Sequence, residues 1–184
     1  MGSSKSAQAL ITKFNYEELG MRVWLIKPSV DDRFGADLVK SRIGLSAKAQ
    51  NIYQDSNIIN EFQRLRDIDV IIADESQFFM EWHIDQLREL VDSVNIPVIC
   101  FGLRVDFRTK LFPGSKRLFE LADSISEIKT VCKCGSKATV NARFDEKGRV
   151  LSEGEQVVLG GNDRYIAMCH KCWKKALKEQ NYRT

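Results

Sequence analysis

The chain has 184 residues and a formal net charge of +3, with 43% hydrophobic and 29% charged residues. This length suits one well-buried domain and a small satellite, and it is short of two full-sized domains. No apolar run approaches the ~20 residues that span a bilayer, which argues against a membrane protein. The charge is too small and dispersed for a nucleic-acid-binding face. The first residues lack the basic start and apolar stretch of a secretory signal, so we expect a cytoplasmic protein.

Three apolar runs of strand length occur in the first two thirds of the chain, at residues 23–26, 70–73 and 98–101. Runs this short and this apolar are typical of strands buried in a parallel sheet. Amphipathic stretches separate them, as a parallel sheet covered by helices requires. The sequence therefore predicts an α/β fold with helices flanking a parallel sheet.

Three amphipathic stretches predict helices, one before the first of these strands and two between them. The first covers residues 6–19 and is followed by Gly20, a residue that often ends helices. The second is predicted to be capped by Ser56 and to turn its apolar residues, as far as Leu65, inward. The third covers residues 82–94, where Trp, Leu and Val recur at helical spacing.

The pattern changes near residue 129. Short alternating runs follow, such as residues 138–142 and 156–159, bounded by glycine and by pairs of cysteines. Such alternation predicts short strands. We therefore divide the chain into an α/β domain at residues 1–128 and a small β-rich module at residues 129–184.

Two close pairs of cysteines lie in this module. They are Cys132 with Cys134 and Cys169 with Cys172. Four thiolates spaced in this way are typical of a structural zinc site, whose tetrahedral shell leaves no open position, although one residue between the first two ligands is fewer than usual. Disulfides are the alternative, which a cytoplasmic setting disfavours. We expect sulfur to complete the shell without His83 or His170, and we expect Cys100, inside an apolar run, to be a buried apolar residue.

The string Gly2-Ser3-Ser4-Lys5-Ser6 precedes the first predicted helix, where a phosphate-binding loop would lie. Such a loop surrounds anionic oxygens with backbone N–H groups, while a lysine reaches the phosphates and the next serine or threonine holds Mg²⁺. Lys5 and Ser6 fit these two roles. The usual pattern has glycine at Ser4, where a side chain costs about 1 kcal/mol if φ is positive and little if the residue is helical. A flexible terminal segment is the alternative.

Asp74 and Glu75 directly follow the apolar run at residues 70–73. Because strand ends in open α/β sheets border the ligand crevice, Asp74 is a candidate to hold Mg²⁺ through water and Glu75 to accept a proton from an attacking hydroxyl. Together with Lys5 and Ser6 they supply the cation, the metal-binding carboxylate and the base that phosphoryl transfer needs. Acidic residues that merely begin a polar loop are the alternative.

Several longer motifs occur together along nearly the whole chain. They are Met1-Gly2-Ser3-Ser4-Lys5-Ser6, Lys27-Pro28 with Asp31-Asp32-Arg33, Asp74-Glu75-Ser76-Gln77-Phe78-Phe79, Gly102-Leu103-Arg104-Val105-Asp106-Phe107-Arg108, the cysteine pairs and Gly160-Gly161-Asn162-Asp163-Arg164-Tyr165. In combination they resemble the type II thymidine kinases, the family of the cytosolic enzyme of animals and of many bacterial enzymes. The resemblance implies a P-loop (RecA-like) sheet with a zinc-binding C-terminal lasso domain. It also implies transfer of the γ-phosphoryl group of ATP to the 5′-hydroxyl of thymidine, and of deoxyuridine.

The resemblance also assigns roles to single residues. Glu75 is the general base, and Ser6 and Asp74 hold the Mg²⁺ that accompanies ATP. The residues implied to bind ATP and its phosphates are Gly2, Ser3, Ser4, Lys5, Ser6, Arg33, Asp74 and Gln77. The residues implied to enclose the nucleoside are Met1, Asp31, Phe78, Leu103, Phe107, Arg108, Val157, Val158 and Tyr165, with the segment at Val157 and Val158 offering backbone hydrogen bonds. Without the resemblance, Phe107 and Tyr165 would be interpreted as packing residues, and Asp31 with Arg33 as a surface ion pair.

The resemblance further implies nucleotide salvage, a homotetramer and feedback inhibition by dTTP, with no nucleic-acid or membrane partner. The residues alone leave two other functions open. One is a zinc-ribbon nucleic-acid-binding module fused to a degenerate ATPase-like domain, and the lack of basic clusters beside the cysteine pairs argues against it. The other is an ATPase without acceptor chemistry, which the serine at position 4 keeps open.

Overall fold

The computed structural model describes residues 4–31, 37–156 and 165–181. The chain forms two compact units. The larger comprises Ser4–Arg104 and Phe112–Ile125, and the smaller includes Val105–Leu111 and the described residues of Ser126–Thr184. Within the described ranges, no helix combines the length and the apolar character needed to cross a bilayer.

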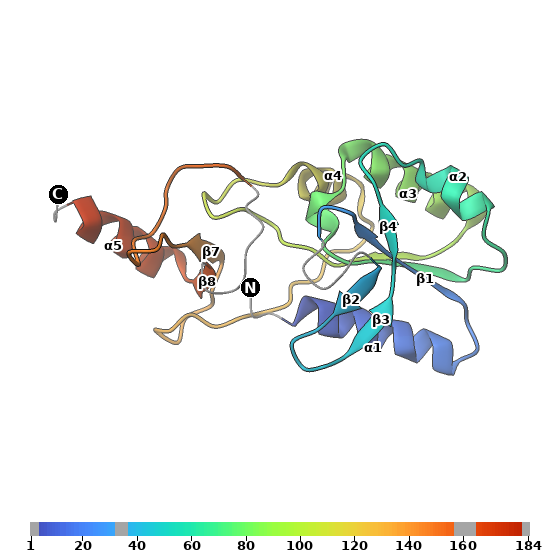
Figure 1. The fold of residues 1–184 in the computed structure, drawn as a ribbon, viewed down its shortest axis with the longest axis horizontal. Coiled ribbons are helices and arrows are strands. Elements are labelled where there is room, and N and C mark those ends of the chain that lie inside the picture. Colours follow the sequence, from blue (N-terminus) through green and yellow to red (C-terminus); the bar gives the residue numbers. More distant parts are fainter. Residues whose placement is uncertain (1–3, 32–36, 157–164, 182–184) are drawn as a thin grey trace. The chain divides into compact units, whose positions relative to one another are not determined.

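A four-stranded parallel sheet forms the centre of the larger unit (Figure 1). In spatial order its strands are β4 (Gln50–Ile52), β1 (Val23–Pro28), β5 (Val70–Ala73) and β6 (Val98–Cys100). The three strands predicted from apolar runs are confirmed, although β1 continues to Pro28 and β6 ends at Cys100. The β4 strand was missed because it is an edge strand of three residues, two of which are the polar Gln50 and Asn51.

Helices cover both faces of this sheet. On one side lies α1 (Lys5–Glu18), and on the other lie α2 (Ile58–Gln63), α3 (Glu81–Val94) and α4 (Pro113–Leu121). The three predicted helices are present, and α4 was not predicted. The cap of α2 was predicted wrongly: the Asn57 side chain accepts from the Asn60 backbone N–H at 2.9 Å. Ser56 instead accepts a hydrogen bond from the Tyr53 backbone N–H.

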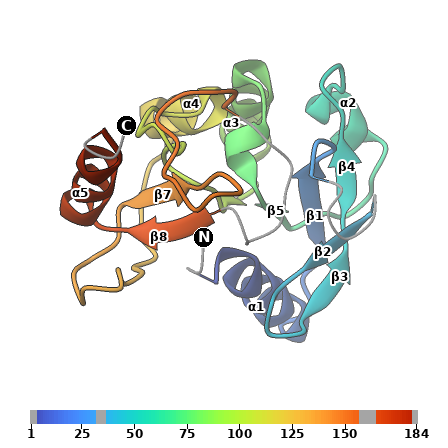
Figure 2. The ribbon, with the colours of Figure 1, turned by 60° about the vertical axis from the view of Figure 1, so that its left-hand side comes forward.

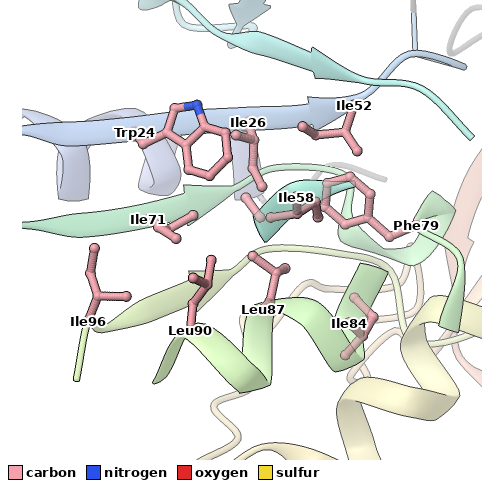
Figure 3. Close-up of a cluster of buried hydrophobic side chains, with 11 residues drawn as sticks. Trp24, Ile26, Ile52, Ile58, Ile71, Phe79, Ile84, Leu87, Leu90 and Ile96 are labelled. Atoms are coloured by element: carbon pink, nitrogen blue, oxygen red, sulfur yellow. The ribbon is translucent and has the colours of Figure 1, made fainter. Parts of the chain in front are cut away.

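The larger hydrophobic cluster fills the space between the sheet and α3 (Figure 3). Alternation along the strands places Ile26 and Ile71 on this face, where they meet Leu87 and Leu90 of α3. Each side chain of this size contributes about 1.5–3 kcal/mol when it is buried. The core therefore fixes β5, the strand that is followed by Asp74 and Glu75.

The opposite face of the sheet packs against α1. Leu25 and Ile72 meet Ala9 and Leu10 of the helix. By contrast, Phe14 of the same helix is 58% exposed, so the apolar stripe predicted for residues 6–19 is only partly buried. A short antiparallel hairpin, β2 (Leu38–Lys40) with β3 (Ser46–Lys48), adds the buried Val39 to this side.

The smaller unit is built on an antiparallel pair, β7 (Val140–Arg143) and β8 (Tyr165–Met168), beside α5 (His170–Asn181) (Figure 2). One of its apolar clusters joins Val140, Ala142 and Val150 to Trp173 and Leu177 of α5. The alternating run predicted at residues 138–142 therefore becomes a strand from Val140 onward. Of the run predicted at residues 156–159, Gln156 is not in a strand and the other three lie outside the described residues.

Candidate active site

The end of β5 carries two buried carboxylates. The backbone N–H of Asp74 donates to the Ile26 carbonyl at 3.0 Å, which continues the ladder between β5 and β1. Glu75 follows with a left-handed backbone, φ 49° and ψ 36°, and η1 (Ser76–Phe78) begins after it. A non-glycine residue in this conformation costs roughly 1–3 kcal/mol and persists where the surrounding structure enforces it. The turn places two successive acids at the carboxyl edge of the sheet with different surroundings.

The N-terminus of α1 meets this edge of the sheet. The side chain of Ser6 is hydrogen-bonded to Asp74, and the positive charge of Lys5 acts on the same carboxyl group. Ser4 precedes the helix with φ 55°. Its backbone therefore has the positive φ at which a side chain costs about 1 kcal/mol, and is not helical. The structure thus brings the predicted phosphate-binding residues Lys5 and Ser6 to the predicted metal-binding acid.

The carboxyl group of Asp74 has a raised pKa. Burial, followed by the charge of Glu75, raises the pKa of its carboxyl group from 3.8 to about 6, while Ser6 and Lys5 pull it down. One oxygen, Oδ1, is buried and has no hydrogen-bond partner among the described residues. Because buried polar atoms are rarely left unpaired, such an oxygen fits a metal-bound water or another polar ligand. Asp74 and the hydroxyl of Ser6 are thus suited to a hard cation such as Mg²⁺.

Gln77 links Glu75 to the loop that follows β6. Its Nε2 donates to Glu75 Oε2 at 2.6 Å, and its Oε1 accepts from the Leu103 backbone N–H at 2.8 Å. A side chain at Gly102 would lie 3.0 Å from Gln77 Oε1, so the glycine permits this close approach. A Cβ at Gly114 would lie only 2.6 Å from the Phe79 carbonyl, so α4 packs directly against η1. The hydrogen bonds of Gln77 and the packing of α4 against η1 therefore both hold the segment that follows Glu75 in place.

The predicted nucleoside residues are divided between the two units. In the larger unit, Phe78 makes an edge contact with Phe112 at 5.6 Å, and the Leu103 carbonyl accepts from Ser115. Asp31 is 8% exposed, which does not fit the surface ion pair weighed as an alternative. In the smaller unit lie Phe107, Arg108 and Tyr165, with Tyr165 in β8. The predicted residues outside the described ones are Met1, Gly2, Ser3, Arg33, Val157 and Val158.

The four cysteines of the smaller unit converge. Their sulfur atoms all lie within 4.8 Å of one another, and the Sγ atoms of Cys134 and Cys169 are 3.7 Å apart. Four sulfurs about 2.3 Å from a zinc ion would be about 3.8 Å apart, so this group could hold a metal ion. The close first pair is accommodated by a turn in which Gly135 has φ 85° and donates to the Cys132 carbonyl. Hydrogen bonds, first from Ser136, lower the pKa of Cys134 to about 6, which favours a thiolate ligand.

The chain is similar in sequence to known proteins over most of its length. The thymidine kinase family model matches residues 1–173. Thymidine kinase of Salmonella typhimurium strain LT2 is 45% identical over 182 residues, which is 97% of this chain and 89% of that protein. Thymidine kinase of Vibrio vulnificus is 44% identical over 96% of this chain and 94% of that protein. Thymidine kinase of Escherichia coli K12 is 44% identical over 97% of this chain and 88% of that protein.

The chain belongs to the thymidine kinase family. It is therefore an enzyme, and the α/β fold and the cysteine cluster described above are those of a thymidine kinase family member. The resemblance inferred from the motifs is confirmed.

Among the described residues of this thymidine kinase family member, three buried charged side chains were given no role from the sequence: Lys27, Asp106 and Arg143. Lys27, on β1, donates to the carbonyls of Asp31 and Leu38 at 2.7 and 3.0 Å. Asp106 accepts from the backbone N–H groups of Arg108 and Lys110. The motifs contain the first two residues but give no sign of burial, and Arg143 lies outside every motif.

Proposed function

We propose that the chain transfers the γ-phosphoryl group of ATP to the 5′-hydroxyl of thymidine, giving dTMP, and that it also accepts deoxyuridine. Residues 1–128 would be the nucleotide-binding kinase domain, and residues 129–184 the zinc-binding domain that contributes to the nucleoside site. The observation that carries the proposal is the convergence of Lys5, Ser6, Asp74 and Glu75 in a chain of the thymidine kinase family.

Ser6 and Asp74 would hold the Mg²⁺ of the ATP complex, which when bound offsets charge on the β- and γ-phosphates. The unpartnered Asp74 Oδ1 supports this role. Lys5 and the N-terminus of α1 would bind the phosphates, since backbone N–H groups at a helix start attract anions. Gly2, Ser3 and Ser4 would complete the loop, and Arg33 would lie near the transferred phosphoryl group.

Glu75 would accept the proton of the 5′-hydroxyl. The hydroxyl oxygen then forms a bond to the γ-phosphorus, and the bond from that phosphorus to the β,γ-bridging oxygen breaks, leaving ADP. The side-chain amide of Gln77 is hydrogen-bonded to Glu75 and to the Leu103 backbone N–H. Gln77 would therefore orient the Glu75 carboxylate next to the phosphate site. The strained left-handed backbone of Glu75 is consistent with a functional role for this residue.

The residues that would bind the nucleoside are those implied by the family resemblance. The proposed set is Met1, Asp31, Phe78, Leu103, Phe107, Arg108, Val157, Val158 and Tyr165. Aromatic side chains suit this task because they bury a flat base with little loss of conformational entropy.

Zinc would occupy the cysteine cluster and would have a structural role, because four sulfurs leave no coordination position for a substrate. A cytoplasmic location is proposed from the cysteines, none of which forms a disulfide. We also propose a homotetramer, feedback inhibition by dTTP and a place in nucleotide salvage, all from the family resemblance.

The test is to incubate the purified chain with ATP, Mg²⁺ and each deoxynucleoside in turn, and to separate the products by chromatography. The proposal requires dTMP to form, with dUMP as the second product and little from the purine nucleosides. ATP hydrolysis that does not depend on thymidine would favour an ATPase instead. Salt-dependent binding of DNA or RNA with no nucleoside product would favour a nucleic-acid-binding module.

A further inference from the structure

Two arginines flank the Phe107 ring within the smaller unit. The guanidinium carbon of Arg143, on β7, lies 3.7 Å from the ring centroid, and that of Arg108 lies 5.5 Å from it. A guanidinium this close to an aromatic ring is held by attraction to the π-electrons, and the interaction is strongest where water is excluded. Phe107 is 2% exposed and Arg143 is 4% exposed, so the closer pair is desolvated. Arg143 therefore limits how the ring can move.

Three consecutive residues, Gly154, Glu155 and Gln156, are also held by hydrogen bonds, the first two through their backbone carbonyls and the third through its side chain. Arg143 Nη1 donates to the Glu155 carbonyl at 2.9 Å. Arg108 Nη1 donates to the Gly154 carbonyl at 3.2 Å, and the side-chain Nε2 of Gln156 donates to Asp106 Oδ2 at 3.1 Å. This short segment, residues 154–156, is therefore joined by hydrogen bonds to the loop that carries Phe107 and to β7.

The lack of a side chain at Gly154 leaves room for the Arg143 guanidinium. The φ of Gly154 is 123°, and a Cβ there would lie 2.6 Å from Arg143 Nη2. Arg143 Nε is buried and has no hydrogen-bond partner within the described ranges. A buried, incompletely paired arginine is a poor choice for stability alone, because unpaired buried donors cost free energy that an apolar side chain of similar length would avoid.

We infer that Arg143 is a positioning residue for the nucleoside: it holds the Phe107 ring and the segment 154–156 in one geometry without reacting itself. The inference rests on the proposed function, in which Phe107 borders the thymine ring. Because Lys5, Ser6, Asp74 and Glu75 all belong to the other unit, loss of Arg143 should weaken thymidine recognition and leave ATP binding and the chemical step intact.

The test compares Arg143→Met, which keeps the length of the side chain and removes its charge, with Arg143→Lys, which keeps a cation without the planar fork. Arg149→Met is the matched control, since Arg149 belongs to the same region and its ion pair with Asp145 is exposed. For each full-length variant the steady-state kcat and the KM for thymidine and for ATP are measured. The zinc content of each preparation is also measured.

We expect Arg143→Met to raise the KM for thymidine about tenfold or more, with kcat and the KM for ATP changed less than about twofold. Arg143→Lys should lie between this variant and the wild type, and Arg149→Met should match the wild type. A folded, zinc-loaded Arg143→Met protein with an unchanged KM for thymidine would overturn the inference. So would equal increases in both KM values.

Gly154→Ala provides a second approach, in which the Arg143 side chain is present but displaced. Its Cβ would displace the guanidinium, and a side chain at φ 123° also strains the backbone, so the KM for thymidine should rise. In the double variant with Arg143→Met the increases should be less than multiplicative, because the displaced group is already absent. Multiplicative effects would contradict the inference. A wild-type chain that forms no dTMP would instead defeat the proposed function, so the two failures can be told apart.

Discussion

The two units of the chain are stabilised in different ways. The larger unit has buried clusters on both faces of its sheet, and its acidic pair follows a strand in which every residue is buried. The smaller unit has two small apolar clusters, one of which contains the cysteines Cys132 and Cys169. It also contains hydrogen bonds made by the buried side chains of Asp106 and Arg143.

This difference matches the proposed division of labour. Phosphoryl transfer needs groups held to within a fraction of an ångström, and a well-packed sheet provides that rigidity. A unit that relies on a metal and on hydrogen bonds has a smaller apolar core to stabilise it, so its stability depends on each of those contacts. Perturbations should therefore affect the two units unequally.

Removal of the proposed zinc ion should produce the largest difference between them. Binding of a structural zinc ion contributes on the order of 10 kcal/mol. We expect a chelator, or Cys169→Ser, to abolish hydrogen-exchange protection in β7 and β8 while β1 and β5 keep theirs. Cys100→Ser is the control, because Cys100 packs against the large core outside the sulfur cluster, and it should retain one zinc per chain. Native protection of β7 and β8 in protein shown by mass spectrometry to be metal-free would contradict the account.

A pH-dependent effect of intermediate size is expected in the larger unit. Burial and Glu75 raise the pKa of Asp74 to about 6 from 3.8, so between these values the native state binds more protons than the unfolded state. The stabilisation that Asp74 gives relative to Asp74→Asn is therefore present below about pH 4 and lost as the pH rises through about 6. The loss should be roughly 3 kcal/mol, measured by urea unfolding without Mg²⁺ or ATP. A difference that does not vary with pH would show that the carboxyl is not perturbed.

The smallest effect concerns the helix start beside the acids. Ser4 has φ 55° and its side chain makes no capping hydrogen bond, so Ser4→Gly should relieve backbone strain and raise the free energy of unfolding by about 0.5–1 kcal/mol. Asn95→Gly, at φ 59° after α3, is the matched control and should gain less, because asparagine tolerates this conformation better than serine. Destabilisation by Ser4→Gly would mean that the serine makes a contact that glycine cannot replace.

Much of the larger unit was predictable because its signals are local. The run at residues 70–73 is wholly apolar and is followed by two acids, which is sufficient to predict a buried strand with a site at its end. The β4 strand gave no such signal, since Gln50 becomes a strand residue by pairing with Ile26 in β1. The cap of α2 was misplaced by one residue because Ser56 and Asn57 are both good capping residues, and only the folded backbone selects between them.

The smaller unit was predictable mainly through its cysteines. Their spacing indicated a metal cluster, and the turn at Gly135 explains why a single intervening residue suffices. Arg143 could not be recognised, because its contact with Phe107 joins residues 36 positions apart (143 minus 107), one in β7 and the other in the chain between β6 and α4. Burial of a charged residue is a tertiary property that a local sequence pattern does not encode.

The most direct test of the central claim is the rate of phosphoryl transfer in Glu75→Gln. The substitution keeps the size and the hydrogen-bonding capacity of the side chain and removes its ability to accept the hydroxyl proton. If Glu75 is the base, kcat should fall about 10²- to 10⁴-fold while calorimetry shows ATP and thymidine binding close to wild type. Glu81→Gln, at the exposed start of α3, should behave as wild type. A Glu75→Gln enzyme with full kcat would contradict the mechanism proposed for this site.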